Sequence, residues 1–326
     1  MSGAQNMLVG DVGGTHARFA TVNVAAPMPW RLENRQDLAM EFPTFEAALQ
    51  RYVELAGLAR MPTAATIAVA GPITEGRVRF TNRNWLVSED ALRNMGCAQS
   101  LLINDFIALA FAIDTLHAKD LRTLGPELPG MPDQPITILG AGTGFGVSCL
   151  ARYRGRVAPV ATEGGHIGFA PGDEQELAVL QVLMKRFERV SVERVLSGPG
   201  LENLYQALEQ VAGRTAAPLT AAQIAQQAEQ SNAGCRAALT MFCGIYGAVA
   251  GDFALAHGSR GGVYLAGGIA VKIEPFLRQS PFRARFESKG RLSGYVQPIP
   301  TVLIANDDAA LLGSARAGVS LHGAAS

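Results

Sequence analysis

One arrangement of glycines with a neighbouring threonine occurs twice in this chain, each time between two stretches with the composition of β-strands. The residues of the two turns are, in order, Asp11, Gly13, Gly14 and Thr15, and then Gly142, Thr143 and Gly144. Glycine lets the backbone approach an anion closely, and a threonine hydroxyl adds a hydrogen-bond donor. Two such turns predict two lobes that hold one polyphosphate, which indicates an enzyme that uses ATP.

The residues that follow each turn indicate which kind of phosphate loop is present. A Walker loop or a dinucleotide fingerprint leads from a strand into a helix. Here residues 17–24 and 147–153 are rich in β-branched and aromatic types and open with no helix cap. The chain has no G-x-x-x-x-G-K-[ST] string, and the second turn misses the dinucleotide spacing by one residue. The sequence therefore predicts two β-hairpins whose turns bind phosphate.

Asn104 and Asp105 follow a short apolar stretch that reads as a buried strand. Open α/β sheets bind ligands outside the carboxyl ends of their strands. There Asp105 could act as a general base, holding an acceptor hydroxyl in line with a γ-phosphate. The alternative is that Asp105 only caps a helix that begins at Phe106. Asp11 has a similar pair of interpretations, since it could orient Mg²⁺ through water or only stabilise its turn.

Three further clusters carry polar or glycine residues at predicted loops. Glu163 and His166 are separated by two glycines, which predicts a tight loop that aims both side chains into one space. Sugar hydroxyls need such paired donors and acceptors, although a single histidine is more often structural. Glu193 taken alone reads as a solvated helix residue. Gly267 and Gly268 follow an apolar strand, as close approach to a nucleotide base or ribose would require.

Composition limits the classes of protein that fit. The 326 residues predict about two domains, and 48% apolar with 17% charged residues excludes disorder. The 28 basic and 28 acidic residues cancel, so no nucleic-acid partner is expected. The four cysteines have no metal-ligand spacing and are expected to be reduced. The first residues carry no basic run or apolar segment, which predicts no signal peptide and a cytoplasmic location.

The pattern of elements alternates between strands and helices. The longest apolar stretch, near 241–256, is interrupted by Asp252 and is expected to be too short for a membrane span. Its spacing from Gly247 to Gly251 predicts a close helix contact in the core. We expect a small lobe from residues 1–112, completed by a C-terminal helix in 306–326, and a large lobe from residues 113–305.

Taken together, these strings resemble the bacterial glucokinases of the proteobacterial type, within the hexokinase–actin–Hsp70 superfamily. The matching strings are GDVGGTHARFA, INDF, GAGTGFGV, EGGHIGFAP, SVERVLSGPGLENLY and GGVYLAGGI. The resemblance implies an α/β, two-lobed actin-like ATPase (ribonuclease H-like) fold, with a mixed sheet in each lobe and a central cleft. It also implies phosphorylation of D-glucose at the 6-hydroxyl with Mg·ATP, and a homodimer.

The resemblance also implies roles for individual residues. Asp105 matches the catalytic base, and the matching sugar contacts are Asn104, Asp105, Glu163, His166 and Glu193. The positions expected to contact the nucleotide are Asp11, Gly13, Gly14, Thr15, Gly142, Thr143, Gly144, Gly267 and Gly268, with Asp11 reaching Mg²⁺ through water. His16 departs from the family, which often carries asparagine there, and the cysteine cluster that binds zinc in the related ROK kinases is absent.

Two other functions stay open at this point. The sugar-binding residues do not exclude another hexose or an amino sugar, because stereochemical choice depends on the shape of the pocket. A catalytically silent sugar-binding regulator is the second alternative, although such a protein would not need to keep Asp105.

Overall fold

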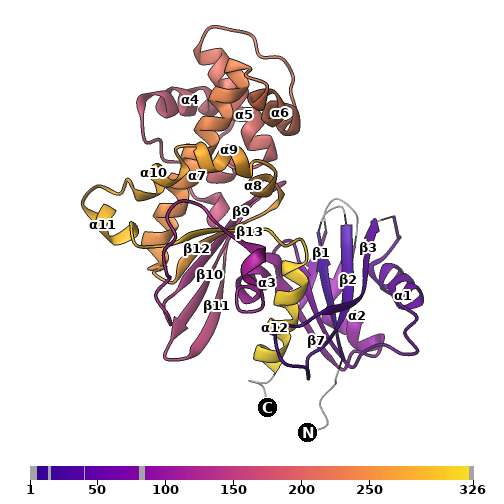
Figure 1. Ribbon diagram of the computed structural model, residues 1–326. Coiled ribbons are helices and arrows are strands. Elements are labelled where there is room, and N and C mark those ends of the chain that lie inside the picture. The colour runs from indigo at the N-terminus through magenta and orange to yellow at the C-terminus, as the bar shows by residue number, and fades with distance from the viewer. Residues whose placement is uncertain (1–5, 14–15, 40, 81–84, 323–326) are drawn as a thin grey trace. The chain divides into compact units, whose positions relative to one another are not determined.

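The computed structural model describes residues 6–13, 16–39, 41–80 and 85–322, and the chain divides into two compact units (Figure 1). Unit 1 comprises Met1–Asp120 and Asn306–Ser326, and unit 2 comprises Leu121–Ala305. The sequence placed the first boundary at residue 112, where a helix of unit 1 ends.

Unit 1 contains a five-stranded mixed sheet with the strand order β3-β2-β1-β4-β7. Its strands are β1 (Asn6–Val12), β2 (His16–Asn23), β3 (Leu32–Ala39), β4 (Ala64–Val69) and β7 (Gln99–Asn104). The first three strands pair antiparallel, whereas β1, β4 and β7 pair parallel. Every residue of β4 is buried, as expected for a central parallel strand that is covered on both faces.

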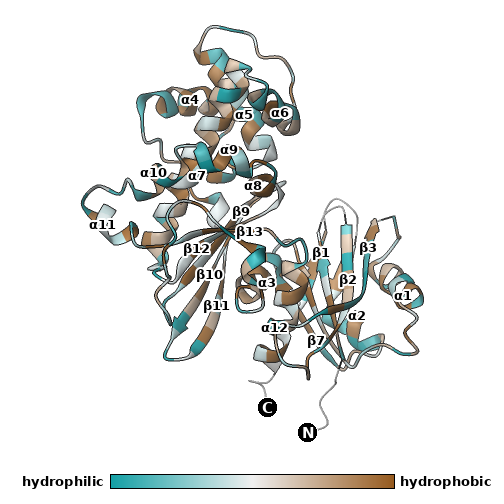
Figure 2. Cartoon of the chain, in the orientation of Figure 1, coloured by the Kyte–Doolittle hydropathy of each residue, from teal (hydrophilic) through white to brown (hydrophobic). Residues whose placement is uncertain are grey.

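The helices of unit 1 are α1 (Phe45–Leu55), α2 (Glu89–Asn94), α3 (Asp105–Ala112) and α12 (Ala309–His322). A short ribbon of β5 (Arg77–Arg79) and β6 (Leu86–Ser88) leads into α2, and the 3-10 turn η1 covers Ala118–Asp120. Helix α1 is amphipathic, as its mixed colours in Figure 2 show, and it buries Phe45, Leu49 and Tyr52. The predicted cap at Ser88 is confirmed, because its side chain accepts the Ala91 N–H at 3.1 Å.

Helices α3 and α12 pack directly on each other, although about 200 residues separate them in sequence (Figure 1). A Cβ added to Gly313 would lie 1.8 Å from the carbonyl oxygen of Ala108. The two backbones approach this closely only because Gly313 has no side chain. The C-terminal helix is thereby held on the helix that begins at Asp105.

Unit 2 contains a six-stranded mixed sheet with the strand order β11-β10-β9-β12-β13-β8. Its strands are β8 (Leu121–Thr123), β9 (Ile136–Ala141), β10 (Phe145–Tyr153), β11 (Arg156–Thr162), β12 (Gly262–Ala266) and β13 (Thr301–Ile304). Strands β9, β12 and β13 are parallel, and the other pairings are antiparallel. The predicted hairpins, β1–β2 and β9–β10, are both confirmed.

The long helices of unit 2 lie between β11 and β12 in the sequence, and the short ones lie between β12 and β13. The long ones are α4 (Glu174–Met184), α5 (Gly198–Val211), α6 (Ala221–Glu229) and α7 (Ala233–His257). The short ones are α8 (Gly268–Lys272), α9 (Glu274–Gln279), α10 (Phe282–Glu287) and α11 (Ser293–Val296), with 3-10 turns η2 (Gly164–His166), η3 (Val192–Arg194) and η4 (Gly290–Leu292).

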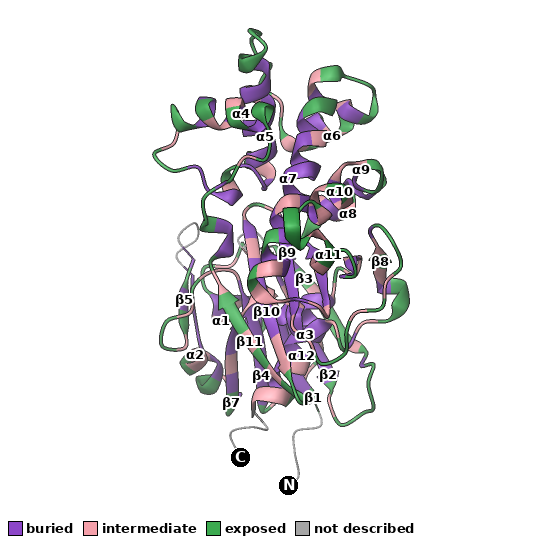
Figure 3. Cartoon of the chain, turned by 90° about the vertical axis from the view of Figure 1, so that its left-hand side faces the viewer, coloured by how far each residue is buried: buried purple, intermediate pink, exposed green. Residues whose placement is uncertain are grey.

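Helix α7 is the central helix of unit 2 and is longer than the sequence suggested. By length and composition alone its 25 residues could cross a membrane, which corrects the expectation that this stretch is too short. However, 78% of its most apolar window is buried inside unit 2, as its purple colour in Figure 3 shows. Its apolar composition is therefore accounted for by the core that it fills.

The predicted close helix contact is confirmed on the face of α7 toward α10. A Cβ on Gly247 would lie 1.9 Å from the Phe282 carbonyl oxygen, and one on Gly251 would lie 2.4 Å from the Phe286 carbonyl oxygen. At Gly244, one turn earlier, the nearest atom would be Pro281 Cγ at 3.5 Å, an ordinary contact distance.

These distances predict opposite effects for two alanine substitutions in one helix. Gly247→Ala should destabilise unit 2 by about 1–3 kcal/mol, because its methyl group must push α10 away. Gly244→Ala is the matched control and should be neutral or stabilising by up to about 1 kcal/mol, because alanine favours the helix and has room there. Urea unfolding monitored by circular dichroism measures both, and equal stabilities would contradict the packing described.

Candidate functional site

The first glycine turn joins β1 to β2 at one edge of the unit 1 sheet. The Gly13 N–H donates to the carbonyl oxygen of His16 at 3.0 Å. Gly14 and Thr15, both predicted to contact phosphate, lie outside the described residues. His16, the departure from the family pattern, is the first residue of β2 and is exposed.

The turn and the Asn104–Asp105 pair lie at the same edge of the sheet. In the parallel registers Val12 pairs with Val69, and Val69 pairs with Asn104. Only β4 separates β1 from β7, so Asn104 lies about 10 Å from the end of β1 at the usual strand spacing. The strand ends expected to carry the chemistry of unit 1 are thus neighbours.

Helix α3 begins at Asp105, with Asn104 as its N-cap. The Phe106 N–H donates to Asn104 Oδ1 at 2.9 Å and also lies 3.0 Å from Asp105 Oδ1. The alternative prediction, in which Asp105 is the cap and the helix begins at Phe106, is wrong by one residue. Asp105 is half-buried in the first turn of α3, where the helix dipole favours a carboxylate.

Asp11 forms an ion pair across the β1–β2 hairpin. It is the register partner of Arg18, and its Oδ2 lies 3.6 Å from Arg18 Nη1. Arg18 also lies 3.5 Å from Asp37 through Nε and donates to the Asp307 carbonyl oxygen at 3.1 Å. Burial raises the pKa of Asp11 above its usual value, while Arg18 opposes the shift and Asp37 and Asp308 add to it.

The second glycine turn joins β9 to β10 in unit 2, and another segment holds it from outside. Within the turn the Gly142 N–H donates to the Gly144 carbonyl oxygen at 2.8 Å. The Gly198 N–H, at the start of α5, donates to the Gly142 carbonyl oxygen at 2.8 Å. Thr143 is exposed at the tip.

Glu193 is the second external contact of this turn. Its Oε2 accepts the Phe145 N–H at 2.9 Å, and its side chain is half-buried. The interpretation of Glu193 as an ordinary solvated helix residue is therefore wrong. Its carboxylate contacts the second glycine turn, which belongs to a segment 48 residues away in the sequence.

Glu163 is the N-cap of the 3-10 turn η2 and His166 is its last residue, and this turn packs against β10. Their side chains come together, with Glu163 Oε2 3.9 Å from His166 Nε2, and they are 72% and 60% exposed. Gly165 packs against the turn, since a Cβ there would lie 2.0 Å from the Phe145 carbonyl oxygen. The Val192 N–H donates to the Ile167 carbonyl oxygen at 2.9 Å, which ties this loop to the segment that carries Glu193.

Gly267 and Gly268 lie beside the second turn on the next strand. Ala266 at the end of β12 pairs with Gly140 of β9. Gly267 has a positive φ of 87°, and a Cβ there would lie 2.4 Å from the Ala141 carbonyl oxygen. The positive φ and the close approach each require glycine at position 267. Gly267 and Gly268 are both exposed, so the backbone at this edge of the sheet is open.

The structure thus gathers the predicted residues into one group in each unit. At one sheet edge of unit 1 they are Asp11, Gly13, Asn104 and Asp105, and around one turn of unit 2 they are Gly142, Thr143, Gly144, Glu163, His166, Glu193, Gly267 and Gly268. Arg18, the partner of Asp11, is not among the residues predicted from the sequence. Counting outward from the predicted hairpin turn would have paired the two.

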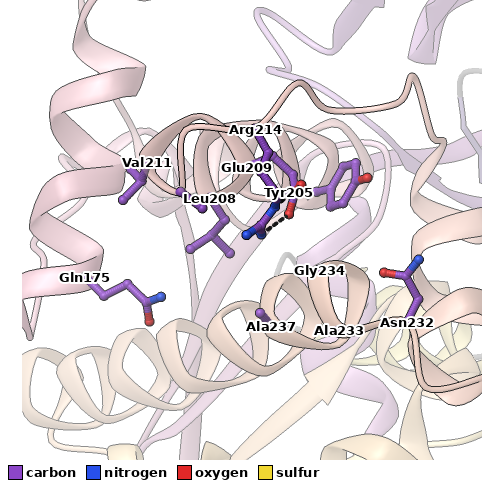
Figure 4. Close-up of a pocket in the computed structure, with 11 residues that line it drawn as sticks. Gln175, Tyr205, Leu208, Glu209, Val211, Arg214, Asn232, Ala233, Gly234 and Ala237 are labelled. Atoms are coloured by element: carbon purple, nitrogen blue, oxygen red, sulfur yellow. Dashed lines mark hydrogen bonds and ion pairs between the residues drawn. The ribbon is translucent and has the colours of Figure 1, made fainter.

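Unit 2 also contains a pocket of about 490 Å³ that includes none of the predicted residues (Figure 4). It lies between α5 and α7, and Gln175 of α4 contributes to its lining. The two charged residues that line it form an ion pair, in which Arg214 donates two hydrogen bonds to Glu209, at 2.8 and 2.7 Å. The hydrogen bonds from Arg214 lower the pKa of Glu209, so this pair supplies no unmatched charge for a ligand.

Solved structures match this fold over nearly its whole length. The crystal structure of a glucokinase from an Antarctic psychrotroph superposes with a TM-score of 0.88 at 35% identity, covering 98% of this chain and 99% of that one. A ROK family glucokinase from Streptomyces griseus, solved with glucose and AMPPNP, has a TM-score of 0.62 at 18% identity, covering 95% and 98%, a likeness of fold alone. The chain is therefore an actin-like α/β kinase with a mixed sheet in each of two lobes, which confirms the expected fold class.

Sequence comparison defines the family within this class. The family model described as Glucokinase matches residues 8–320. The glucokinase of Caulobacter vibrioides is 48% identical over 311 residues, covering 94% of this chain and 93% of the relative. That of Chromobacterium violaceum is 43% identical over 311 residues, covering 94% and 88%. The chain belongs to the glucokinase family and is an ATP-dependent hexose kinase, which confirms the resemblance.

The ion pair of Asp11 predicts a pH-dependent effect of removing Arg18. Arg18→Met should lower the free energy of unfolding at pH 7 by about 1–3 kcal/mol, because it leaves a largely buried carboxylate without its countercharge. The loss should shrink as the pH falls through the raised pKa of Asp11, since the protonated acid no longer needs the cation. Urea unfolding at several pH values measures this dependence.

The double variant Arg18→Met/Asp11→Asn is the control for this prediction. It should recover part of the lost stability at pH 7 and show little remaining pH dependence. Equal losses for the single and double variants at every pH would contradict an energetic coupling between Asp11 and Arg18.

Proposed function

We propose that this chain transfers the γ-phosphoryl group of ATP to the 6-hydroxyl of D-glucose, giving glucose 6-phosphate and ADP. The observation that carries the choice of glucose is the 48% identity to a glucokinase over 94% of the chain. The placement of Asn104 and Asp105 at the sheet edge that also carries the first phosphate turn supports the same reaction.

In this proposal Asp105 is the general base. Its carboxylate accepts the hydrogen of the glucose 6-hydroxyl, orients the oxygen toward the γ-phosphorus and takes the proton as the new P–O bond forms and the bond to ADP breaks. The Phe106 N–H lies 2.9 Å from Asn104 Oδ1 and 3.0 Å from Asp105 Oδ1, so the backbone at the start of α3 helps to hold the Asp105 carboxylate in place. The position of Asp105 at the start of a helix that packs on α12 also restricts its motion.

The proposed sugar contacts are Asn104, Asp105, Glu163, His166 and Glu193. The Oδ1 of Asn104 is used by the helix cap, so its amide group is the part that can donate to a sugar hydroxyl. Glu163 and His166 lie 3.9 Å apart and are exposed, so together they offer an acceptor and a donor to neighbouring hydroxyls. A site built from such polar groups rejects analogues that leave them unpaired.

The proposed nucleotide contacts are Asp11, Gly13, Gly14, Thr15, Gly142, Thr143, Gly144, Gly267 and Gly268. The turns offer backbone N–H groups to the phosphate oxygens, and exposed Thr143 adds a hydroxyl. The open backbone at Gly267 and Gly268 supports their assignment to the nucleoside.

Mg²⁺ is proposed to accompany ATP, where it neutralises charge on the transferred phosphoryl group. Among the described residues no group of three or more His, Cys, Asp or Glu side chains could hold a metal ion. This fits Mg²⁺, which keeps several waters and takes phosphate oxygens as ligands. Asp11 is 22% exposed beside the first turn, and its carboxylate is proposed to bind a water of that ion.

The role of Asp105 predicts a large loss of turnover without loss of sugar binding. Asp105→Asn should lower kcat by about 100- to 10,000-fold, because the amide cannot accept the proton. The Kd for glucose, measured by calorimetry, should change much less, since the amide still hydrogen-bonds a hydroxyl. Asp90→Asn, at the start of α2, is a matched control that removes an exposed first-turn acid. Wild-type turnover in Asp105→Asn would exclude Asp105 as the base.

The choice of glucose is tested with a panel of hexoses and amino sugars in the presence of Mg·ATP, with ADP and sugar phosphate measured separately. A strong preference for glucose is expected. A higher kcat/KM for another sugar would contradict the assignment, and sugar binding with no transfer would favour a silent regulator.

We also propose a cytoplasmic homodimer, on the resemblance to the bacterial glucokinases alone. Sedimentation velocity tests the dimer, and a single species of monomer mass at micromolar concentration would contradict it.

A further inference from the structure

The segment from Ser191 to Gly200 attaches to the second phosphate turn at two separate points. The carboxylate of Glu193 accepts the Phe145 N–H at 2.9 Å, and the Gly198 N–H donates to the Gly142 carbonyl oxygen at 2.8 Å. One contact lies at each end of the turn. The conformation of the turn therefore depends on this segment as well as on the β9–β10 hairpin.

Gly144 makes the Glu193 contact sterically possible. A Cβ at Gly144 would lie 2.5 Å from Glu193 Oε2, well inside contact distance. A Cβ at Gly142, two residues earlier in the same turn, would meet nothing within 4 Å. Neither glycine has a positive φ, so the backbone at both positions accepts alanine. The two alanine substitutions therefore differ mainly in whether the added methyl group meets Glu193.

The backbone of Glu193 is fixed on both sides. Ser197 Oγ donates to the Glu193 carbonyl oxygen at 2.8 Å and accepts the Gly200 N–H at 2.9 Å. The Val192 N–H is held by the Ile167 carbonyl oxygen, one residue after His166. Glu193 therefore lies in a short connection between the Glu163–His166 loop and the phosphate turn.

The two oxygens of the Glu193 carboxylate have different surroundings. Oε2 is occupied by the Phe145 N–H, whereas Oε1 has no protein partner within the described part of the chain. An oxygen without a partner can accept a sugar hydroxyl while the other keeps its backbone contact, because a carboxylate has several acceptor positions.

We propose that Glu193 is a positioning residue for the phosphate turn as well as a sugar contact, so that sugar binding and the geometry of the second turn are coupled. This rests on the proposed function, since it takes glucose as the sugar. A sugar held on Oε1 restricts the carboxylate and thereby the Phe145 N–H. Because coupling between two binding sites is reciprocal, a nucleotide bound at the turn must change the sugar affinity by the same factor as the sugar changes the nucleotide affinity.

The sharpest test measures glucose affinity without any nucleotide. Gly144→Ala should weaken glucose binding by about tenfold or more, the scale of a lost hydrogen bond to a charged group, because its methyl group displaces the Glu193 carboxylate. Gly142→Ala adds the same methyl group to the same turn without touching Glu193, and it should leave the glucose Kd nearly unchanged. Isothermal titration calorimetry gives both values, with thermal melts to confirm that each variant is folded.

A second pair of variants tests the hold on the turn through ADP affinity, which needs no sugar. Glu193→Gln keeps an oxygen that can accept the Phe145 N–H and should bind ADP nearly as wild type does. Glu193→Ala leaves that N–H without its partner and should bind ADP several-fold more weakly. Both variants should bind glucose more weakly than the wild type does, because both lack the carboxylate that is proposed to contact the sugar.

The outcomes separate this inference from the proposed function. Equal glucose affinities for Gly144→Ala and Gly142→Ala, or equal ADP affinities for Glu193→Ala and Glu193→Gln, would overturn the coupling while wild-type glucose phosphorylation persists. Absence of glucose binding by the wild type would overturn the glucokinase proposal instead. The ADP comparison would still decide whether Glu193 holds the turn.

Discussion

The conformation of the second glycine turn depends on the close approach of other segments to the backbone of residues 141–145. The Glu193 carboxylate reaches the Phe145 N–H over Gly144, Gly165 packs against the Phe145 carbonyl oxygen, and Gly267 packs against that of Ala141. Each approach requires the absence of a side chain. Because these glycines come from different segments, one short stretch of backbone brings together the residues proposed to contact the sugar and those proposed to contact the nucleotide.

In unit 1 the predicted site residues are brought together by the register of the strands and not by close packing against glycines. The parallel pairing of β1, β4 and β7 brings the first turn and Asn104 to one sheet edge. Asn104 then ends the strand and caps α3, which places Asp105 in the first helical turn. The arginine that pairs with Asp11 comes from the other strand of the hairpin, and Asp37 of β3 and Asp308 add negative charge beside this pair.

The sequence predicted the parts of this arrangement that depend on local pattern. Both hairpins, the α/β class and the glycine contact of α7 follow from composition and spacing, and each is present. The contact between Glu193 and Phe145 could not be predicted locally, because 48 residues separate them and the surroundings of Glu193 resemble an ordinary helix start. The helix cap was misplaced by one residue because Asn104 and Asp105 are both good cap residues, and only the backbone geometry separates them. The functional assignment of Glu193 came from the family resemblance, whereas its contact with the turn came from the structure.

Glucose is proposed to act on the second glycine turn through Glu193, and hydrogen exchange at the Phe145 amide reports on the contact that would carry this effect. Exchange would be measured by mass spectrometry on peptides covering residues 140–148, with and without saturating glucose and with no nucleotide. We predict slower exchange at Phe145 with glucose in the wild type, and a much smaller effect in Gly144→Ala at glucose concentrations that saturate that variant. Unchanged exchange at Phe145 in a wild-type protein shown to be saturated with glucose would exclude an effect of the sugar on the turn through Glu193.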